Sequence, residues 1–484
     1  MTTIKLDPGA ALLLDALHGA GHAAYAVGGC VRDSLLGLDP HDWDLCTSAR
    51  PEQVMALFGE EKCIPTGLQH GTVTVKQGGR LYETTTFRTE GAYSDGRHPD
   101  AVCFVPDVRE DLARRDFTIN AMAYSAEEGL IDPFGGRDDL AAHLVRAVGE
   151  PERRFEEDAL RILRLYRFAA RFGFAIDPAT GAAARALGPH LDCVSAERIQ
   201  EELLKLLAAP RPGSYLEPAV LAVVLPELEP EKQPEQFAEL CRTIDRIEPT
   251  AENVPARLAA LLCPLGEAGA RKALRKLKCS NALTDEVTAL EREAGGGAGS
   301  FLLGHEFELR HPADALCLER HSHPAGRCPN SNSLFPPQAA VVAVAGHSIA
   351  RPIACGNRVP PQRTVLRGTP GTPNTTLTVQ AKRLLGRYEL PTIQRLTALC
   401  SARHPEQAVA FAALRAEAEQ LTAENACCRV SQLAVNGRDL MAAGVRPGPG
   451  LRQVLNALLE AVITGQTPNE KDALLAAAAQ FSAS

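Results

Sequence analysis

One stretch of the chain, Ala23–Leu45, contains an apolar run, a glycine turn, a short helix and two aspartates in that order. The apolar run Ala23–Val27 has the length of a buried strand, and the glycine pair at 28 and 29 predicts a turn directly after it. Residues Val31–Leu36 then predict one or two helical turns. The stretch therefore predicts a strand, turn and helix that lead directly into two acidic residues.

The two acids are Asp42 and Asp44, which flank Trp43. If this segment is a strand, its period of two residues puts both carboxylates on one face. Two carboxylates so close together cannot both ionise comfortably without a cation, and a divalent metal ion is the usual solution. A lone glycine pair is most often only a turn, and a lone Asp-x-Asp is most often a solvated loop. The strand, turn, helix and Asp-x-Asp in this order form a much narrower pattern.

Two later segments predict an antiparallel hairpin beside this strand. Residues 71–76 (GTVTVK) and 81–88 (LYETTTFR) are rich in β-branched residues and are separated by the glycine pair at 78 and 79. Glu83 lies in the second segment, where a buried acid without a partner would be costly. Two interpretations remain open: an outward-facing edge residue, or a third acid beside Asp42 and Asp44 that helps to hold metal ions.

Composition limits the class of protein. The chain has 484 residues, 45% hydrophobic and 5% aromatic, which predicts several soluble, helix-rich domains. No segment reads as a membrane span and the N-terminus does not resemble a signal peptide, so we expect a cytoplasmic protein. The 14 cysteines are scattered, as expected of reduced thiols. Because the net charge is −8, any nucleic-acid partner must bind local basic patches.

Two places could contact such a partner. A basic cluster on a predicted helix consists of Arg271, Lys272, Arg275, Lys276 and Lys278. It could contact RNA phosphates in a salt-dependent way, or it could be a solvated helix face. Near the C-terminus, Gly448 and Gly450 precede a helix whose free backbone N–H groups could bind phosphate or could simply be capped.

A second motif is the amphipathic segment Pro151–Phe174, PERRFEEDALRILRLYRFAARFGF. Its apolar residues recur at helical spacing and predict a buried helix face. Asp158, Arg161 and Arg164 form a polar stripe at intervals of three residues. The stripe is either a solvated face or a rigid acceptor and donor pair that can read the Watson–Crick edge of a base.

Seven motifs carry a family resemblance: GGCVRD, HDWDL, TGLQHGTVTV, ETTTFR, RRDFTINAMAY, IDPFGGRDDL and EDALRILRLYRFAARFGF. The first two resemble the nucleotidyltransferase signature of the polymerase-β superfamily. Together, in motif order from about residue 20 to residue 207, the seven resemble the bacterial class II CCA-adding tRNA nucleotidyltransferases. The resemblance implies an α+β, polymerase-β-like head with a small mixed sheet, followed by an all-α neck, body and tail. It also implies Mg²⁺-dependent nucleotidyl transfer from CTP and ATP to the tRNA 3′ end, without a nucleic-acid template and with release of pyrophosphate.

The resemblance also assigns roles to individual residues. Asp42 and Asp44 would bind magnesium, and Glu83 would complete the catalytic acids. The residues implied to bind the nucleotide come from the glycine turn, the RRDFTIN segment and the helix after residue 151: Gly28, Gly29, Arg32, Arg115, Asp116, Asn120, Asp158, Arg161, Arg164 and Arg167. Within that set, Asp158 and Arg161 would form the protein template that selects CTP and ATP.

Three related activities share such a head: full CCA addition, partial addition of CC or A, and bacterial poly(A) polymerisation. In these families, CC-adding enzymes lack a flexible loop, whereas residues 90–100 (EGAYSDGRHPD) resemble the intact loop with Asp95 and Arg97 as its polar pair. Bacterial poly(A) polymerases carry an arginine-rich segment where this chain has TGLQHGTVTV. These features favour full CCA addition, and a tRNA-binding protein without enzymatic activity is a further alternative.

The expected domains are a nucleotidyltransferase head (residues 1–140), a neck with the nucleotide-selecting helix (141–208), a helical body (209–316) and a helical, tRNA-binding tail (389–484). Residues 317–388 differ in composition from the rest of the chain. No Asp or Glu occurs between Glu319 and Glu389, while Pro, Gly, Thr, Asn and Arg accumulate. Three interpretations are open: a basic linker that touches RNA, an inserted segment, or, as we favour, a compensated reading-frame slip in the coding sequence.

Overall fold

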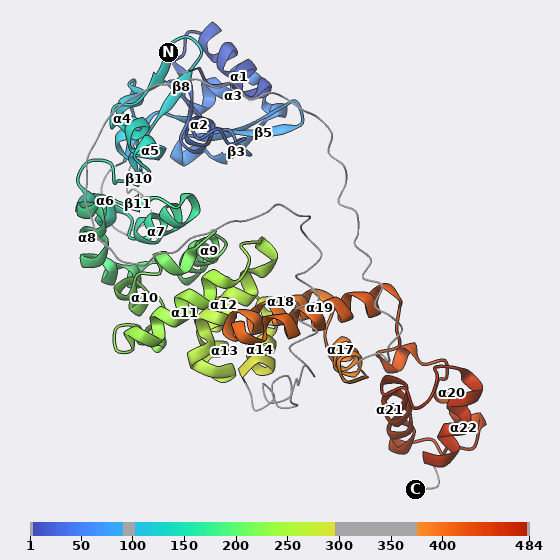
Figure 1. Ribbon diagram of the computed structural model, residues 1–484. Coiled ribbons are helices and arrows are strands. Elements are labelled where there is room, and N and C mark those ends of the chain that lie inside the picture. The colour runs from blue at the N-terminus through green and yellow to red at the C-terminus, as the bar shows by residue number, and fades with distance from the viewer. Residues whose placement is uncertain (1–2, 91–101, 296–374, 482–484) are drawn as a thin grey trace, which may run out of the picture.

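The structure is a computed structural model that describes residues 3–90, 102–295 and 375–481 (Figure 1). The predicted loop residues Asp95 and Arg97 and most of the acid-free segment 317–388 lie outside the described residues. The N-terminal head contains a seven-stranded sheet in the order β3-β4-β5-β2-β1-β8-β9. In chain order its strands are β1 (Ala24–Val27), β2 (Leu45–Thr47), β3 (Cys63–Gly67), β4 (Thr72–Gln77), β5 (Arg80–Thr86), β8 (Ala123–Ser125) and β9 (Gly129–Ile131).

The sheet is mixed, because β2 and β5 run parallel while the other neighbouring strands pair antiparallel. This arrangement confirms the predicted α+β head with a small mixed sheet. Short strands outside this sheet form two further pairs, β6 (Arg88–Glu90) with β7 (Val102–Phe104) and β10 (Leu144–Val145) with β11 (Ala175–Ile176).

Both faces of the sheet are buried, and alternate residues of β1 enter different cores. Ala24 packs in the larger core together with residues of α1 and α3, whereas Tyr25 packs in a second core with residues of α4. The helices of the head are α1 (Pro8–Gly19), α2 (Gly29–Leu35), α3 (Pro51–Phe58), α4 (Val108–Ala113) and α5 (Gly136–Ala141). Burial on both faces explains why β1 is a continuous apolar run with no polar alternation.

The hairpin predicted from residues 71–88 is present as β4 and β5. Lys76 pairs with Leu81, and the turn between the strands places Gly78 at φ 58° and Gly79 at φ 80°. Two successive residues in the left-handed region are what a two-residue type I′ turn requires, which is why glycine is needed at both positions. The register of this hairpin positions Glu83 on β5.

The segment Pro151–Phe174 is not one helix, which corrects the prediction. It forms α6 (Pro151–Glu157) and α7 (Leu160–Phe172), and Asp158 between them is extended at φ −147° and ψ 103°. The Asp158 carboxylate accepts a hydrogen bond from the backbone N–H of Leu160 at 3.0 Å. Aspartate competes well for backbone donors at a helix start, so a local side-chain bond ends the first helix and opens the second.

Helices form most of the rest of the described chain. They are α8 (Pro178–Ala186), α9 (Ala196–Leu207), α10 (Pro218–Val224), α11 (Pro234–Arg246), α12 (Val254–Leu262), α13 (Gly266–Lys276), α14 (Asn281–Gly295), α17 (Thr375–Arg387), α18 (Leu390–Arg403) and α19 (Ala408–Ala423). The apolar residues Ile199, Leu203, Leu206 and Leu207 recur at helical spacing along α9, and all four are buried. Among the described residues, no helix is long and apolar enough to span a membrane.

The helical body is assembled from two separate parts of the chain. Helix α18 packs against α11, α12 and α14, although residues 296–374 separate α14 from α17 in sequence. Buried Glu291 of α14 pairs with Arg403 of α18 at 3.0 Å. Helix α17 begins at Thr375, inside the segment 317–388. Its apolar residues Ala381 and Leu384 are buried in the core that it shares with the body.

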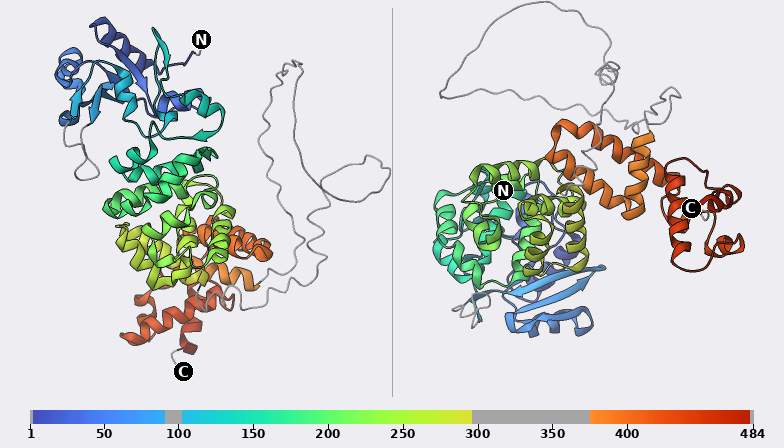
Figure 2. Two further views of the ribbon diagram at one scale, coloured as in Figure 1. Left: turned by 90° about the vertical axis from the view of Figure 1, so that its left-hand side faces the viewer. Right: turned by 90° about the horizontal axis from the view of Figure 1, so that it is seen from below.

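The C-terminal tail has its own core. Its helices are α20 (Gly437–Ala442), α21 (Pro449–Ile463) and α22 (Lys471–Phe481), and their apolar side chains, including Leu440, Leu458 and Leu474, form a separate cluster. Head and tail lie at opposite ends of the molecule with neck and body between them (Figure 2). The chain order therefore runs from head to tail along the long dimension of the molecule.

Candidate active site

The glycine turn is the first part of the site. Gly28 follows β1, adopts φ 77° and ψ −120°, and is the N-cap residue of α2. A Cβ atom at Gly28 would lie 2.8 Å from Nη1 of Arg115. Glycine is therefore favoured at this position by its backbone conformation, and a larger residue would also displace the end of the Arg115 side chain.

The two aspartates lie just before β2 instead of within a strand. Both Asp42 and Asp44 are exposed while Trp43 between them is buried. The placement of both carboxylates on one face stays a prediction. The backbone carbonyl of Asp44 accepts a hydrogen bond from the N–H of Val27 at 2.9 Å. This bond fixes the second aspartate directly beside the end of β1 and the glycine turn.

Glu83 joins the aspartates through the sheet. Leu45 of β2 pairs with Thr84 of the parallel strand β5, so Asp44 and Glu83 precede neighbouring positions in the register. Desolvation by the surrounding protein, followed by the charges of Glu83 and Asp42, raises the pKa of Asp44, while Arg115 acts in the opposite direction. Glu83 is exposed, but its strand β5 lies between β4 and β2 and is not an edge of the sheet, and its charge acts on Asp44. A role of Glu83 in holding metal ions stays a prediction.

The chemistry of these acids fits a divalent cation. Carboxylate oxygens are the ligands that Mg²⁺ prefers, and a carboxylate destabilised by its acidic neighbours gains from a nearby positive charge. In the described parts of the chain, no three His, Cys, Asp or Glu side chains converge tightly enough to bind one ion together. The fit therefore rests on Asp42 and Asp44 as the pair of ligands, with Glu83 as an additional charge beside them.

Arg115, Asp116 and Asn120 come from the segment that joins α4 to β8. Nη2 of Arg115 lies 3.4 Å from the buried carboxylate of Asp111, and its Nε is buried without a hydrogen-bond partner among the described residues. Asn120, in the short 3₁₀ helix η3 (Thr118–Asn120), donates to Asp116 at 3.0 Å and accepts from Arg32 at 2.5 Å. These contacts link the segment to the glycine-turn helix α2.

Asp116 also links the head to the neck. Arg164 of α7 donates to one Asp116 oxygen from Nε at 2.9 Å and from Nη2 at 2.6 Å. Burial alone would raise the pKa of Asp116, but Arg164 and the hydrogen bond from Asn120 hold it well below the usual range of a carboxyl group. Asp116 is therefore a permanently charged junction between two implied nucleotide-binding segments.

Arg32 is packed inside the protein. Only 4% of the residue is exposed, its Nε donates to Asp33 at 2.7 Å, and its guanidinium lies 5.2 Å from the Phe168 ring centroid and 4.9 Å from that of Phe172. This position braces α2 against α7 through cation–π contacts. A direct contact of Arg32 with a triphosphate stays a prediction.

Asp158 and Arg161 do not share one rigid helix, as the break between α6 and α7 shows. The second oxygen of Asp158 accepts from Arg198 of α9 at 2.8 Å. Nη1 of Arg161 donates to Glu157 at 2.8 Å, and its Nη2 donates to the carbonyl of Arg114 at 3.0 Å. The two residues lie at the same helix start, and each has protein partners in this structure.

The remaining neck arginines share an acid that was not predicted. Nε of Arg167 lies 2.6 Å from Glu202, and Nη1 of Arg164 lies 3.8 Å from the same carboxylate. Glu202 and Arg198 stand one helical turn apart on α9. Their sequence signal was a pair of opposite charges at i and i+4, directly beside the buried apolar positions of a helix, which the apolar pattern alone does not reveal.

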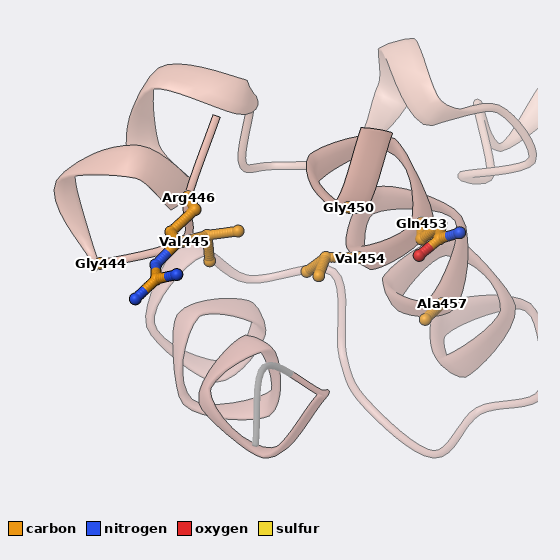
Figure 3. A pocket seen from close by; sticks show the side chains of 7 residues that line it. All are labelled: Gly444, Val445, Arg446, Gly450, Gln453, Val454 and Ala457. Carbon is orange, nitrogen blue, oxygen red and sulfur yellow. The ribbon is translucent and has the colours of Figure 1, made fainter. Parts of the chain in front are cut away.

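The predicted RNA contacts lie far from these residues in sequence. In the basic cluster, Arg271 pairs with Asp285 at 2.9 Å, whereas the lysines and Arg275 are exposed. Gly448 is the N-cap residue of α21, and Gly450 lines a cavity of about 590 Å³ in the tail. Arg446 and Gln453 lie on opposite sides of this cavity (Figure 3).

Three family models match successive parts of the chain. A model described as "Poly A polymerase head domain" matches residues 24–146, and one described as "Probable RNA and SrmB-binding site of polymerase A" matches residues 173–231. A model of tRNA nucleotidyltransferase domain 2 matches residues 383–478. The three matches follow the order of head, neck and tail.

Known proteins match over the whole chain as well as over its N-terminal part. The CCA-adding enzyme of Lactiplantibacillus plantarum is 33% identical over 466 residues, 96% of this chain and 93% of that protein. The enzyme of Leuconostoc citreum is 45% identical over 257 residues, 53% of this chain and 63% of its own length. Other high-identity matches span 48% to 68% of the relatives' lengths. The structure of Bacillus stearothermophilus CCA-adding enzyme in complex with CTP superposes with a TM-score of 0.70 at 29% identity and 98% coverage of both chains.

Proposed function

Since the chain belongs to the CCA-adding enzyme family, we propose that it adds the 3′-terminal CCA sequence to tRNA, using CTP and then ATP and releasing pyrophosphate. The observation that carries the proposal is the effect of the Glu83 and Asp42 charges on Asp44, beside a glycine turn that Arg115 approaches. This arrangement combines an acidic site for a cation with a backbone turn and a cation for phosphate. Such a set serves transfer of a nucleotidyl group, because that reaction needs positioning and charge stabilisation more than covalent chemistry.

Asp42 and Asp44 would hold Mg²⁺, and Glu83 would add negative charge to their site. The bound ion would supply positive charge that assists loss of the proton from the 3′-hydroxyl and stabilises the pyrophosphate leaving group. The glycine turn at Gly28 and Gly29 offers backbone close to the triphosphate. Arg115, whose Nη1 lies next to Gly28, would bind phosphate or ribose.

The neck would select the base. Asp158 provides carboxylate acceptors, and Arg161, Arg164 and Arg167 provide guanidinium donors, near the helix start that follows the head. Because Arg161 already donates to Glu157 and to a backbone carbonyl, binding of a base at this residue requires that it exchanges partners. The loop residues Asp95 and Arg97 would permit the change from CTP to ATP.

The tRNA would extend from the head towards the tail. Exposed Lys272, Arg275, Lys276 and Lys278 offer charges to RNA phosphates, and the start of α21 at Gly448 and Gly450 offers backbone N–H groups. An elongated enzyme of this kind can recognise the overall shape of its RNA instead of a sequence. The match of residues 173–231 to an RNA-binding model supports RNA as the partner.

Poly(A) polymerisation is a second candidate, because the head matches a model named for poly(A) polymerase. The test incubates the purified chain with tRNA that ends at the discriminator base, Mg²⁺, and CTP and ATP singly or together. We expect two C residues from CTP alone and ordered C, C, A from both nucleotides. A homopolymer of A would support the second candidate, addition that stops at CC would indicate a partial enzyme, and binding without extension would contradict both enzymatic proposals.

A further inference from the structure

We propose that the segment Ala426–Gln432 is a rigid joint that fixes the tail against α17 and thereby sets which length of RNA the enzyme accepts. The inference rests on the proposed function, because it requires contact of the tail with tRNA. Helix α19 ends at Ala423 and α20 begins at Gly437, so the chain passes from body to tail through this joint. Helix α17 contacts both α19 of the body and α21 of the tail (Figure 1).

Neighbouring side chains of the joint enter two different cores. Cys428 is buried in the larger core together with Leu384 of α17, whereas Cys427 packs against the separate core of the tail. Arg429, the next residue, has an extended backbone with φ −132° and ψ 151°. Successive side chains of an extended chain point to opposite sides. A change in the angle between body and tail therefore disturbs at least one of the two cores.

Arg429 fastens the joint to α17. Its Nε donates to the carbonyl of Leu385 at 3.1 Å, and its Nη2 donates to the carbonyl of Tyr388 at 3.3 Å. Both carbonyls lie at the end of α17, where helix carbonyls lack partners within the helix and the helix dipole favours a cation. Nη2 also lies 2.7 Å from the carboxylate of Glu389, the residue before α18. One guanidinium thus connects the joint to the end of α17 and to the start of α18.

Two further contacts leave the joint little room to move. A Cβ atom at Gly386 of α17 would lie 2.8 Å from the backbone oxygen of Cys428, so this close approach requires glycine. The side-chain oxygen of Gln432 accepts from the backbone N–H groups of Cys428 at 2.9 Å and of Arg429 at 2.8 Å. The backbone oxygen of Gln432 accepts from Asn469 of the tail at 3.0 Å. The contacts therefore run without interruption from α17 through the joint to the tail.

The position of the tail matters because head and tail lie at opposite ends of the molecule (Figure 2). An RNA that contacts both must span the distance between them. Two linked sites bind one ligand far more tightly than either site alone, but only while their geometry permits both contacts at once. With a loose joint the tail can move, so a long RNA loses the benefit of its second contact. A short RNA that reaches only the head loses nothing.

The decisive variant is Arg429→Met, assayed on full tRNA and on a shorter RNA hairpin that carries the same 3′ end but reaches only the head. We expect KM for tRNA to rise about tenfold with kcat unchanged, because the two contacts no longer act together. KM for the hairpin should stay at its wild-type value. Arg415→Met on α19 is the matched control, since this arginine forms an exposed pair with Glu419 and its loss should leave both KM values unchanged.

A second pair of variants decides the question if Arg429→Met fails to fold. Arg383 of α17 forms a surface ion pair with Glu460 of α21, which links the same helix to the tail. Arg383→Glu should raise KM for tRNA about threefold, since surface pairs contribute little, and the additional change Glu460→Arg should restore it. A KM that the exchanged pair does not restore would indicate direct contact of Arg383 with RNA and would count against the joint.

Equal rises of KM for both RNAs in Arg429→Met, or a rise for neither, would overturn the inference. The wild type in the same assay separates this failure from failure of the proposed function. A wild type that extends neither RNA contradicts the proposed function, and one with the same KM for both RNAs contradicts contact of the tail with tRNA. A wild type that adds CCA and binds tRNA more tightly than the hairpin, alongside an unaffected Arg429→Met variant, contradicts this inference alone.

Discussion

At the scale of single residues, the site depends on carboxylates that lie too close together to carry their charges independently. Asp44 is held by the backbone bond from Val27, and desolvation by the surrounding protein, followed by the charges of Glu83 and Asp42, destabilises its ionised form. A bound cation would remove this penalty. The carboxylates whose charges destabilise ionised Asp44 are thus the ones that lie at the proposed metal site.

Asp44→Asn tests this directly, because it preserves the shape of the side chain and removes its charge. We expect nucleotide incorporation to fall about 100-fold or more, since charge stabilisation of the transition state is lost, while triphosphate binding is largely retained. The measurement is the rate of incorporation at saturating CTP. Asp15→Asn, an exposed aspartate on α1, is the control and should leave the rate unchanged. Equal incorporation rates in the wild type and in Asp44→Asn would show that the Asp44 carboxylate does not take part in the reaction.

The pH dependence of activity follows from the same contacts. A carboxylate must be ionised to hold a cation, so activity should fall as the pH drops through the raised pKa of Asp44. Replacing Glu83 by Gln removes a negative neighbour and lowers that pKa, which should move the acid limb of the kcat/KM profile to lower pH. Glu61→Gln, at an exposed acid of the head, should leave the limb in place. An acid limb that does not move in Glu83→Gln would show that Glu83 does not act on Asp44.

At the scale of elements, sequence patterns predicted correctly those features that depend on residues close together in the chain. The strand β1 and the Gly78-Gly79 hairpin follow from periodicity and turn chemistry, and both are confirmed. The break at Asp158 was missed because the apolar periodicity continues through it, while a single side-chain bond to Leu160 interrupts the backbone. The partnership of Glu202 with Arg167 was missed because it joins two helices, and the apolar pattern of each helix does not show which of their charged residues face each other.

The same limit applies to Arg257 of α12, which is fully buried. Its guanidinium donates to the carbonyls of Leu207, Ala209 and Ile247, at the ends of α9 and α11. Helix ends leave carbonyl groups without partners, so one arginine here satisfies two helix ends at once. Helix α9, which carries Glu202, is thereby fixed to the body.

Arg257→Met should therefore destabilise the body by about 3 kcal/mol, because several buried carbonyls lose their donor. The measurement is the free energy of unfolding from urea titration followed by circular dichroism. The matched control is Arg242→Met on α11, whose arginine forms an exposed pair with Glu239 and should change stability by less than about 1 kcal/mol. A similar loss in both variants would argue against a special role for the buried guanidinium.

At the scale of the whole molecule, charge and shape determine how a polyanion could bind. The chain carries a net charge of −8, so attraction to RNA must come from local sites such as the basic cluster at the end of α13. Cations at the end of a helix are also favoured by its dipole, which gives this cluster a structural reason to exist. The salt dependence of tRNA binding distinguishes contact with RNA phosphates from a solvated helix face.

Replacing the four exposed members of the cluster by glutamine should weaken tRNA binding and reduce the slope of log K against log salt. If all four contact phosphates, the slope should become shallower by about 3, since each contact contributes about 0.7 to 0.9. The substitutions are Lys272→Gln, Arg275→Gln, Lys276→Gln and Lys278→Gln. Lys205→Gln combined with Lys232→Gln is the control, because both lysines form exposed ion pairs. A slope equal to that of the wild type would assign the cluster to the solvated surface.

We propose that side chains of the neck, without a nucleic-acid template, choose the incoming base. Arg161→Ala tests it most directly, in single-nucleotide incorporation on tRNA lacking its last three residues with CTP, ATP, UTP and GTP supplied in turn. We predict that the wild type accepts CTP first and excludes UTP and GTP, and that Arg161→Ala blurs this choice while Arg242→Ala on the body surface does not. Unchanged nucleotide choice in a folded Arg161→Ala variant would show that Arg161 does not select the base.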